Sequence, residues 1–292
     1  MCIRDSFSTV INEIFPVDLA FVADGEKLSF EGKEGGEIHS ISPLVDLFGL
    51  KHSIQRWITD YLSGSRYHLK SFKGSLPWDD PKEILNTLEA EVRVDNTEYT
   101  FASGLEPIKA EYTDVYFTKG VLIIKPHEAI FYGQGAGESW LDINFNDPEN
   151  ILLTAYIKTR AVANDDILTL LDYYNIKLPF KQVGGTTKTD LRLAIILNKT
   201  NVQTEGVFEI DEGLLEWAGK NYKVKDARIT MVDSDVTIDQ LKISYGDLLT
   251  AQVSGFIQVE KTTGELNINL LKLDLTLGES QLAVDRSSPM RA

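Results

Sequence analysis

Apolar and polar residues alternate along most of residues 187–277. A period of two places successive side chains on opposite faces of an extended strand. Polar residues such as Arg192, Glu209 and Lys272 occupy every second position. The pattern therefore predicts antiparallel strands with one apolar face and one polar face. The apolar side chains that we expect on that face include Leu191, Leu193, Ile195, Phe208, Ile210, Val253, Ile257, Leu271, Leu273 and Leu275.

Short polar segments separate these strands. Residues 198–201, 211–213 and 262–264 are rich in Asn, Asp, Thr and Gly, which hairpin turns favour, so a turn is predicted at each. Earlier strands are predicted at 17–22, 27–30, 67–74, 84–94, 98–101, 108–117, 121–124, 129–132, 140–145 and 151–161. The sequence thus predicts a mainly β fold with one long antiparallel sheet.

Two stretches have the period of an amphipathic helix instead. Apolar residues recur at steps of three and four within residues 43–62, and Ser42 is in the position of an N-cap. Asn164 precedes a second such pattern at 165–175. One or two amphipathic helices are therefore expected to interrupt the strands.

The strand pattern divides the chain into two segments of the same sheet. Residues 7–180 form a β segment that the helices interrupt, and residues 181–292 continue the antiparallel meander. Residues 1–6, Met-Cys-Ile-Arg-Asp-Ser, resemble a translated sequencing-adapter scar and are set aside as non-native. We therefore expect the chain to be an internal piece of a longer protein.

The predicted apolar face is too large for the helices to cover. About 14 strands of roughly eight residues would give a face of about 65 by 26 Å. A helix of ~20 residues is about 30 Å long and ~10 Å wide. A large apolar face exposed to water promotes aggregation. The face must therefore close into a sandwich or barrel, or contact an apolar partner such as lipid.

Composition narrows the class of partner. Hydrophobic residues make up 43% and charged residues 25% of the chain, as in ordinary globular proteins. The formal net charge of −15 argues against nucleic acid and against an anionic membrane surface as partners. Cys2 is the only cysteine, so an intrachain disulfide is excluded. No apolar run is long enough to span a membrane.

Residues with catalytic or metal-binding chemistry do not form a recognisable motif. The four histidines lack the spacing of zinc ligands, and no serine lies in a nucleophile elbow. The glycine-rich residues 133–137 lack the Lys-Ser/Thr ending of a phosphate loop. We therefore predict no catalytic, cofactor-binding or metal-binding residue, no cofactor and no enzymatic activity. A glycan hydrolase with a cleft of paired carboxylates is the enzyme alternative that stays open.

Several segments together resemble a known family. They are IQRWITDYL at 54–62, FKGSLPW at 72–78, VRV at 92–94, FYG at 131–133, GVFEIDEG at 206–213 and YKVKDA at 222–227. In this order they resemble the AsmA-like superfamily, in particular the YhdP-type proteins of Gram-negative bacteria. The resemblance extends over about residues 42–277.

The resemblance implies a function as well as a fold. Members of the family are anchored in the inner membrane by an N-terminal helix, extend through the periplasm towards the outer membrane and carry phospholipid between the two membranes in a β-sheet groove. By this resemblance the chain would be a periplasmic segment of such a bridge, with its anchor outside this piece. Its sheet would be twisted and curved into a groove, and the ten apolar side chains named above would line that groove. Phospholipid acyl chains would be its ligand, with envelope proteins as further candidate partners. The alternative is a structural β-scaffold of the cell envelope with a sealed core and no role in transport.

Overall fold

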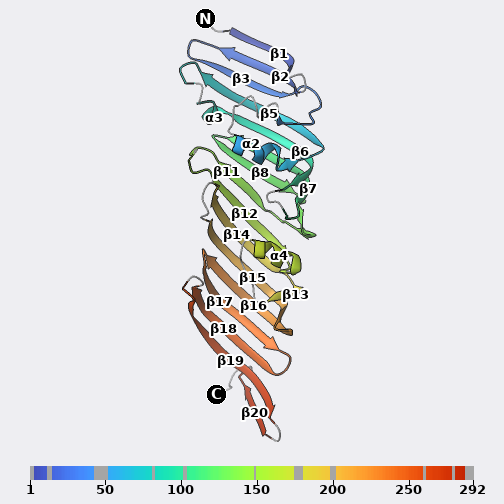
Figure 1. Cartoon of the computed structure of the whole chain (residues 1–292), viewed down its shortest axis with the longest axis vertical. Helices are drawn as coiled ribbons and strands as arrows, with labels where there is room; N and C mark the ends of the chain where they lie inside the picture. The colour runs from blue at the N-terminus through green and yellow to red at the C-terminus, as the bar shows by residue number, and fades with distance from the viewer. Residues whose placement is uncertain are drawn as a thin grey trace. The chain divides into compact units, whose positions relative to one another are not determined.

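A computed structural model of the chain describes residues 3–11, 15–42, 52–80, 83–100, 104–147, 149–173, 180–197, 202–258, 261–277 and 280–286. The fold is mainly β, with a long antiparallel sheet that does not close and a few short helices. The predicted fold class is therefore confirmed (Figure 1).

The chain divides into two compact units. The first comprises Met1–Gly133, Glu138–Ala155 and Ile195–Asn201, and the second comprises Gln134–Gly137, Tyr156–Ala194 and Val202–Ala292. This division passes through strands β12 (Leu152–Ala161) and β14 (Thr187–Ile196) and does not coincide with the predicted change of segment at residue 180. Each unit is described by itself below.

The first unit is an open antiparallel sheet in the order β1-β2-β3-β5-β6-β7-β8-β11, with β4 paired to β6 and β9 to β7. Its strands are β1 (Ile3–Ile11), β2 (Phe15–Ala23), β3 (Lys27–Glu34), β4 (Leu62–Ser63), β5 (Arg66–Pro77), β6 (Glu89–Tyr99), β7 (Ile108–Thr118), β8 (Val121–His127), β9 (Ile130–Phe131) and β11 (Trp140–Asn144). The residues set aside as foreign contribute Ile3–Ser6 to β1, opposite Ala20–Ala23 of β2.

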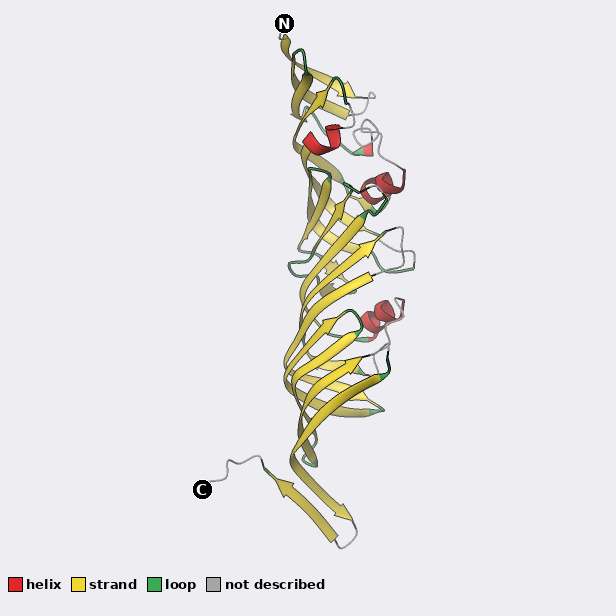
Figure 2. Cartoon of the chain, turned by 90° about the vertical axis from the view of Figure 1, so that its left-hand side faces the viewer, coloured by secondary structure: helices red, strands yellow, loops and turns green. Residues whose placement is uncertain are grey.

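One side of this sheet carries the core of the first unit. Leu69, Val94 and Ile143 come from three strands and are almost completely buried. Trp57 in helix α2 (His52–Thr59) and Tyr61 just after it pack against the same cluster. Their rings lie edge to face with centroids 5.1 Å apart. Figure 2 shows α2 on one side of the strands. A sheet face and an amphipathic helix thus form a two-layer core.

Two phenylalanines fit this core because glycines lie opposite them. In the β3–β5 pair, Phe30 is the partner of Gly74, and Phe72 is the partner of Gly32. A Cβ added to Gly32 would lie 2.5 Å from Cε1 of Phe72 and 2.9 Å from the backbone O of Asp18. Each ring therefore occupies the space that a side chain on the opposite strand would need.

The second unit continues the antiparallel pattern. The order β15-β16-β17-β18-β19-β20 is regular, β13 pairs with the end of β15, and β14 pairs with β12. Its elements are β10 (Gln134–Gly135), α4 (Asp165–Tyr173), β13 (Lys181–Gly185), β15 (Val202–Trp217), β16 (Lys220–Val232), β17 (Asp235–Tyr245), β18 (Leu249–Gln258), β19 (Thr263–Leu277) and β20 (Ser280–Asp285).

The turn predicted at residues 211–213 is wrong, because β15 runs through them. Asp211 and Glu212 are exposed in succession between buried Ile210 and Gly213, so the buried face changes from even to odd positions. β16 changes in step, with exposed Lys225 and Asp226 between buried Val224 and Ala227. The polar residues here therefore mark the point where both strands change which alternate side chains are buried, and the chain does not turn.

Two glutamines hold the connection between β12 and α4. Gln134 donates from Nε2 to the O of Val162 (3.0 Å) and accepts from its N (2.5 Å). The backbone N of Gln182 donates to the O of Ala163 (2.9 Å), and its Oε1 accepts from the N of Ala163 (3.0 Å). These bonds satisfy backbone groups that have left the sheet, as burial requires.

The structure describes the two predicted helices only in part. Of the helix at 43–62, residues 43–51 lie outside the described residues, α2 ends at Thr59, and Leu62 already belongs to β4. α4 begins as predicted, with Oδ1 of Asn164 accepting from the N of Ile167 at 3.2 Å. The predicted strand at 84–94 is wrong at its start, where Ile84–Thr87 form helix α3.

Two other turn predictions have different outcomes. The turn at 198–201 lies outside the described residues, whereas the last one falls at Lys261 and Thr262, because β19 already begins at Thr263.

Candidate functional site

The second unit presents a continuous apolar face across β15 to β19. One row of paired residues runs Phe208, Ile229, Ile238, Gly255 and Leu266. Neighbouring rows run Val224, Ile243, Ala251 and Leu270, then Leu241, Val253 and Ile268. Alternate residues of β18, from Leu249 to Ile257, belong to these rows, so the rows share one face. We call this set of rows the apolar face of the second unit.

Much of the apolar face is accessible to solvent. The exposed fraction is 65% for Ile268, 46% for Leu266 and 36% for Ile257. The buried cluster of this unit consists of only Ile210, Val224 and Ala227 among the described residues. Large apolar side chains that remain exposed together on one sheet face are typical of a surface that binds an apolar partner.

Six of the residues predicted to line the groove lie on this face by strand register. They are Phe208, Ile210, Val253, Ile257, Leu273 and Leu275. Leu273 pairs with Leu249 of β18 and with Val284 of β20, which extends the apolar face by a further strand. The alternation of the sequence therefore brought together residues that the fold also places side by side.

The other four predicted residues have different positions. Leu191 is near the face, because a Cβ on Gly206 would lie 2.8 Å from its Cδ1, and Leu193 follows two residues later in β14. Leu271 is the extra residue where the register of β18 and β19 shifts by one. Ile195 belongs to the first unit and packs against the buried core there.

The opposite face of the second unit is polar. Nζ of Lys188 lies 2.9 Å from Oε2 of Glu209, whose other oxygen is paired with Arg228. Nε of Arg228 also lies 3.5 Å from Oδ2 of Asp239. The hydrogen bond from Lys188 lowers the pKa of Glu209, and Arg228 adds to the effect. Among the described residues this face carries a ladder of ion pairs in water, with Val232 and Phe256 as exposed apolar side chains between the polar ones.

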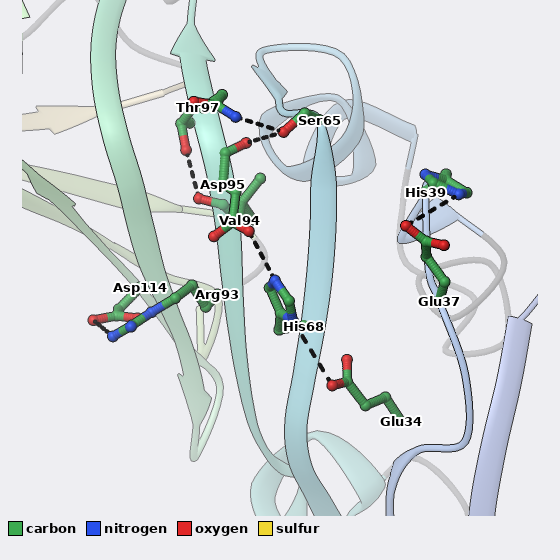
Figure 3. Close-up of polar contacts among 11 residues, drawn as sticks. Glu34, Glu37, His39, Ser65, His68, Arg93, Val94, Asp95, Thr97 and Asp114 are labelled. Atoms are coloured by element: carbon green, nitrogen blue, oxygen red, sulfur yellow. Dashed lines mark hydrogen bonds and ion pairs between the residues drawn. The ribbon is translucent and has the colours of Figure 1, made fainter.

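Polar side chains in the first unit form two clusters that sequence spacing did not reveal (Figure 3). Nε2 of His68 lies 2.8 Å from Oδ2 of Asp95, and Nδ1 of the same ring lies 3.7 Å from Oε1 of Glu34. These residues come from three strands that are far apart in the sequence. Only the pairing of β5 with its neighbours brings them together.

The second cluster is centred on Asp114, a carboxylate with only 6% exposure. Arg93 donates to it from Nε (2.8 Å) and Nη2 (3.1 Å), and Nε2 of His127 lies 3.1 Å from its Oδ2. The guanidinium also lies 4.1 Å from the ring centroid of Tyr112. The hydrogen bond with Asp114 raises the pKa of Arg93. A bidentate pair of this kind fixes the two neighbouring strands to each other and occupies both oxygens of this carboxylate.

A shallow depression on the first unit is lined by both apolar and polar residues of β2, β3 and β5, together with Thr87 and Glu89. Lys73 and Glu89 face it and form an ion pair with Nζ and Oε2 2.8 Å apart. Their hydrogen bond raises the pKa of Lys73 and lowers that of Glu89. Both groups are therefore held in their charged forms and do not suit proton transfer near neutral pH.

Within the part of the chain that the structure describes, no three His, Cys, Asp or Glu side chains are arranged to hold a metal ion. None of the helices in those same residues is long and apolar enough to cross a membrane. No protein-family model, no curated protein and no solved structure matches the chain. Among the described residues, the apolar face of the second unit is the candidate surface for an apolar ligand.

Proposed function

We propose that the second unit binds the acyl chains of phospholipid along its apolar face, as a segment of a periplasmic bridge between the inner and outer membranes. The observation that carries this proposal is the exposure of Ile257, Leu266 and Ile268 on one registered face. Burying an apolar methylene contributes about 0.8 kcal/mol. Acyl chains would therefore gain substantially from replacing water on this surface.

The dimensions of the face suit such a chain. From Leu249 to Ile257 the face extends along β18 over eight residue steps. At about 3.3 Å per residue this is roughly 26 Å. One leaflet contributes about half of the ~30 Å hydrocarbon core of a bilayer, or about 15 Å. An acyl chain lying along the strand would thus be covered over its whole length.

The mechanism that we propose is passive. The rows of paired residues run from strand to strand, so a chain leaving one strand meets apolar side chains on the next. No polar residue in these rows holds a tail at one position, so the tails would slide along the face. Inner-membrane anchoring, phospholipid as cargo and transport between the two membranes come into this proposal from the resemblance of the sequence to the AsmA-like superfamily.

The scaffold alternative has support of its own in the first unit. There, Leu69, Val94 and Ile143 are sealed in a core, with no comparable open apolar face among the described residues. A chain with only that unit would be a structural module. The two readings make different predictions for the second unit alone.

Native mass spectrometry of the whole chain, with lipid extraction from the same sample, tests the proposal. Replacing Ile268 with Asp puts a charge on the apolar face and should lower phospholipid occupancy at least about tenfold, because burying a charge among acyl chains is costly. Phe256→Asp is the matched control, since Phe256 is 45% exposed on the opposite face of adjacent β18. Equal occupancy in both variants, with both folded, would contradict the proposal.

A further inference from the structure

One margin of the apolar face carries a cluster of aromatic rings. Trp217 and Tyr222 have ring centroids 6.0 Å apart, and Tyr222 and Tyr245 follow at 5.3 Å. Tyr222 pairs with Leu215, which packs on the buried cluster of the unit, and Tyr245 pairs with Leu249. The rings therefore continue the apolar face at the ends of three strands. We call Trp217, Tyr222 and Tyr245 the aromatic margin.

A lysine accompanies these rings. Lys220 is the partner of Trp217 across the β15–β16 pair, and its Nζ lies 5.3 Å from the ring centroid of Tyr245. Among the described residues no carboxylate lies within 4.0 Å of it, unlike Lys188 or Lys225, which are ion-paired on the opposite face. The aromatic margin thus holds a cation without an anionic partner.

We propose that Lys220 and the aromatic margin bind the phosphodiester headgroup of the lipid whose tails lie on the adjacent apolar face. This inference rests on the proposed function and names the part of the lipid that the margin recognises. Trp and Tyr suit a boundary of this kind, because an apolar ring body and a polar tip match the change from tails to water. Lys220 would supply the charge complementary to phosphate.

The position of the margin gives the bound lipid a direction. A headgroup at Lys220 would send its tails along the strands towards Phe208, Ile238 and Ile257. At roughly 26 Å this stretch is longer than the ~15 Å that one leaflet's acyl chains span. The lipid would therefore lie with its headgroup at the aromatic margin and its tails directed towards the opposite ends of the strands.

Competition between two lipids with the same acyl chains tests this site. The whole chain is offered equal amounts of phosphatidylglycerol and diacylglycerol in detergent, and native mass spectrometry measures which is bound. The wild-type protein should prefer phosphatidylglycerol by about fivefold, the size of a surface charge interaction. Lys220→Met should abolish this preference, and Lys220→Arg should restore it.

Lys223→Met is the matched control, because Lys223 is exposed three residues along the same strand but on the polar face. Its preference should equal that of the wild type. A wild-type protein that binds both lipids equally, or a Lys223→Met variant that loses the preference as Lys220→Met does, would overturn the inference and leave the proposed function standing. Binding of neither lipid would overturn the proposed function itself.

Two further arms separate the headgroup of a lipid from free phosphate and locate it. Soluble glycerol phosphate at the same concentration should not displace phosphatidylglycerol; displacement that depends on Lys220 would assign the site to a free phosphoester instead.

Trp217 is the only one of the four tryptophans in the second unit. Phosphatidylglycerol brominated near the headgroup should quench fluorescence in the wild type and not in Trp217→Phe, and equal quenching in both would overturn the assignment.

Discussion

The same alternating pattern of apolar and polar residues gives a buried apolar face in the first unit and a largely exposed one in the second. In the first, sixteen of the described residues form one buried cluster, whereas in the second only three do. The second unit also contains most of the large apolar side chains that stay exposed, with Ile268 at 65% as the extreme. Alternation therefore predicts which side chains share a face and leaves open whether that face is covered.

Coverage comes from segments that are not part of the ladder. In the first unit, Ile38 and Ile41 from the connection after β3, together with Trp57 of α2, pack onto the strands. The apolar face of the second unit is less buried because no comparable layer covers it in the described part of the chain. The difference between a core and a binding face is thus a difference in second layers.

The largest expected effect is the difference in stability lost when a leucine is truncated in the first unit and an isoleucine is truncated in the second. Leu69→Ala removes a side chain with no exposure and should lower the free energy of unfolding by about 2–5 kcal/mol. Ile268→Ala, on the open face, should cost at most about 0.5 kcal/mol. Urea unfolding measures both values. A cost for Ile268→Ala as large as that for Leu69→Ala would mean that the second face is sealed.

Adding one methyl group at a glycine should likewise destabilise the first unit more than the second. Gly32→Ala places Cβ 2.5 Å from a ring carbon of Phe72 and 2.9 Å from a backbone oxygen, so it should cost about 1–3 kcal/mol. Gly206→Ala meets only the tip of Leu191 at 2.8 Å before backbone at 3.4 Å, so that leucine can turn away. The second variant should lose less than about 1 kcal/mol. Thermal unfolding compares them, and equal losses would show that the second unit is as tightly packed as the first.

The sequence predicted the strands and their faces well, because a period of two is a local signal. The lining residues Phe208, Val253 and Leu273 follow that period and do share a face. The turn predicted at 211–213 failed because the same residues, Asp, Glu and Gly, also suit a double bulge. Asp226 on the partner strand has φ of 50°, a conformation that no periodic pattern reveals.

Contacts between distant strands were beyond the reach of local patterns. His68 meets Glu34 and Asp95, which are separated from it by many residues, and Ile195 enters the core of the first unit although its period matches Leu191. The sequence alone contains no signal that singles out Lys220, because Trp217 and Tyr245 become its neighbours only through strand pairing. Long-range register, which turn geometry and packing decide, was the missing information.

A smaller effect sharpens the comparison inside the sealed core. The hydroxyl of Thr113 is buried and has no hydrogen-bond partner, whereas that of Thr97 donates to the O of Val94 at 2.9 Å. Thr113→Val should therefore raise the free energy of unfolding by about 1 kcal/mol, because it removes an unsatisfied polar group. Thr97→Val should lower it by about 1 kcal/mol. Urea unfolding gives both, and a loss of stability in Thr113→Val would mean that its hydroxyl is satisfied.

The smallest expected effect concerns the polar face of the second unit, where ion pairs rather than a large core connect the strands. The hydrogen bond from Lys188, and then Arg228, lower the pKa of Glu209 below its usual value of 4.5. A lowered folded-state pKa means that this contribution is complete above the unfolded-state value and is lost as pH falls through the folded-state value. Below about pH 4.5 the wild-type urea midpoint should therefore fall more steeply than that of Glu209→Gln. Glu205→Gln, four residues earlier on the same face, is the control, and its urea midpoint should fall with pH as steeply as that of the wild type. If the urea midpoint of Glu209→Gln fell equally steeply, these ion pairs would not stabilise the second unit.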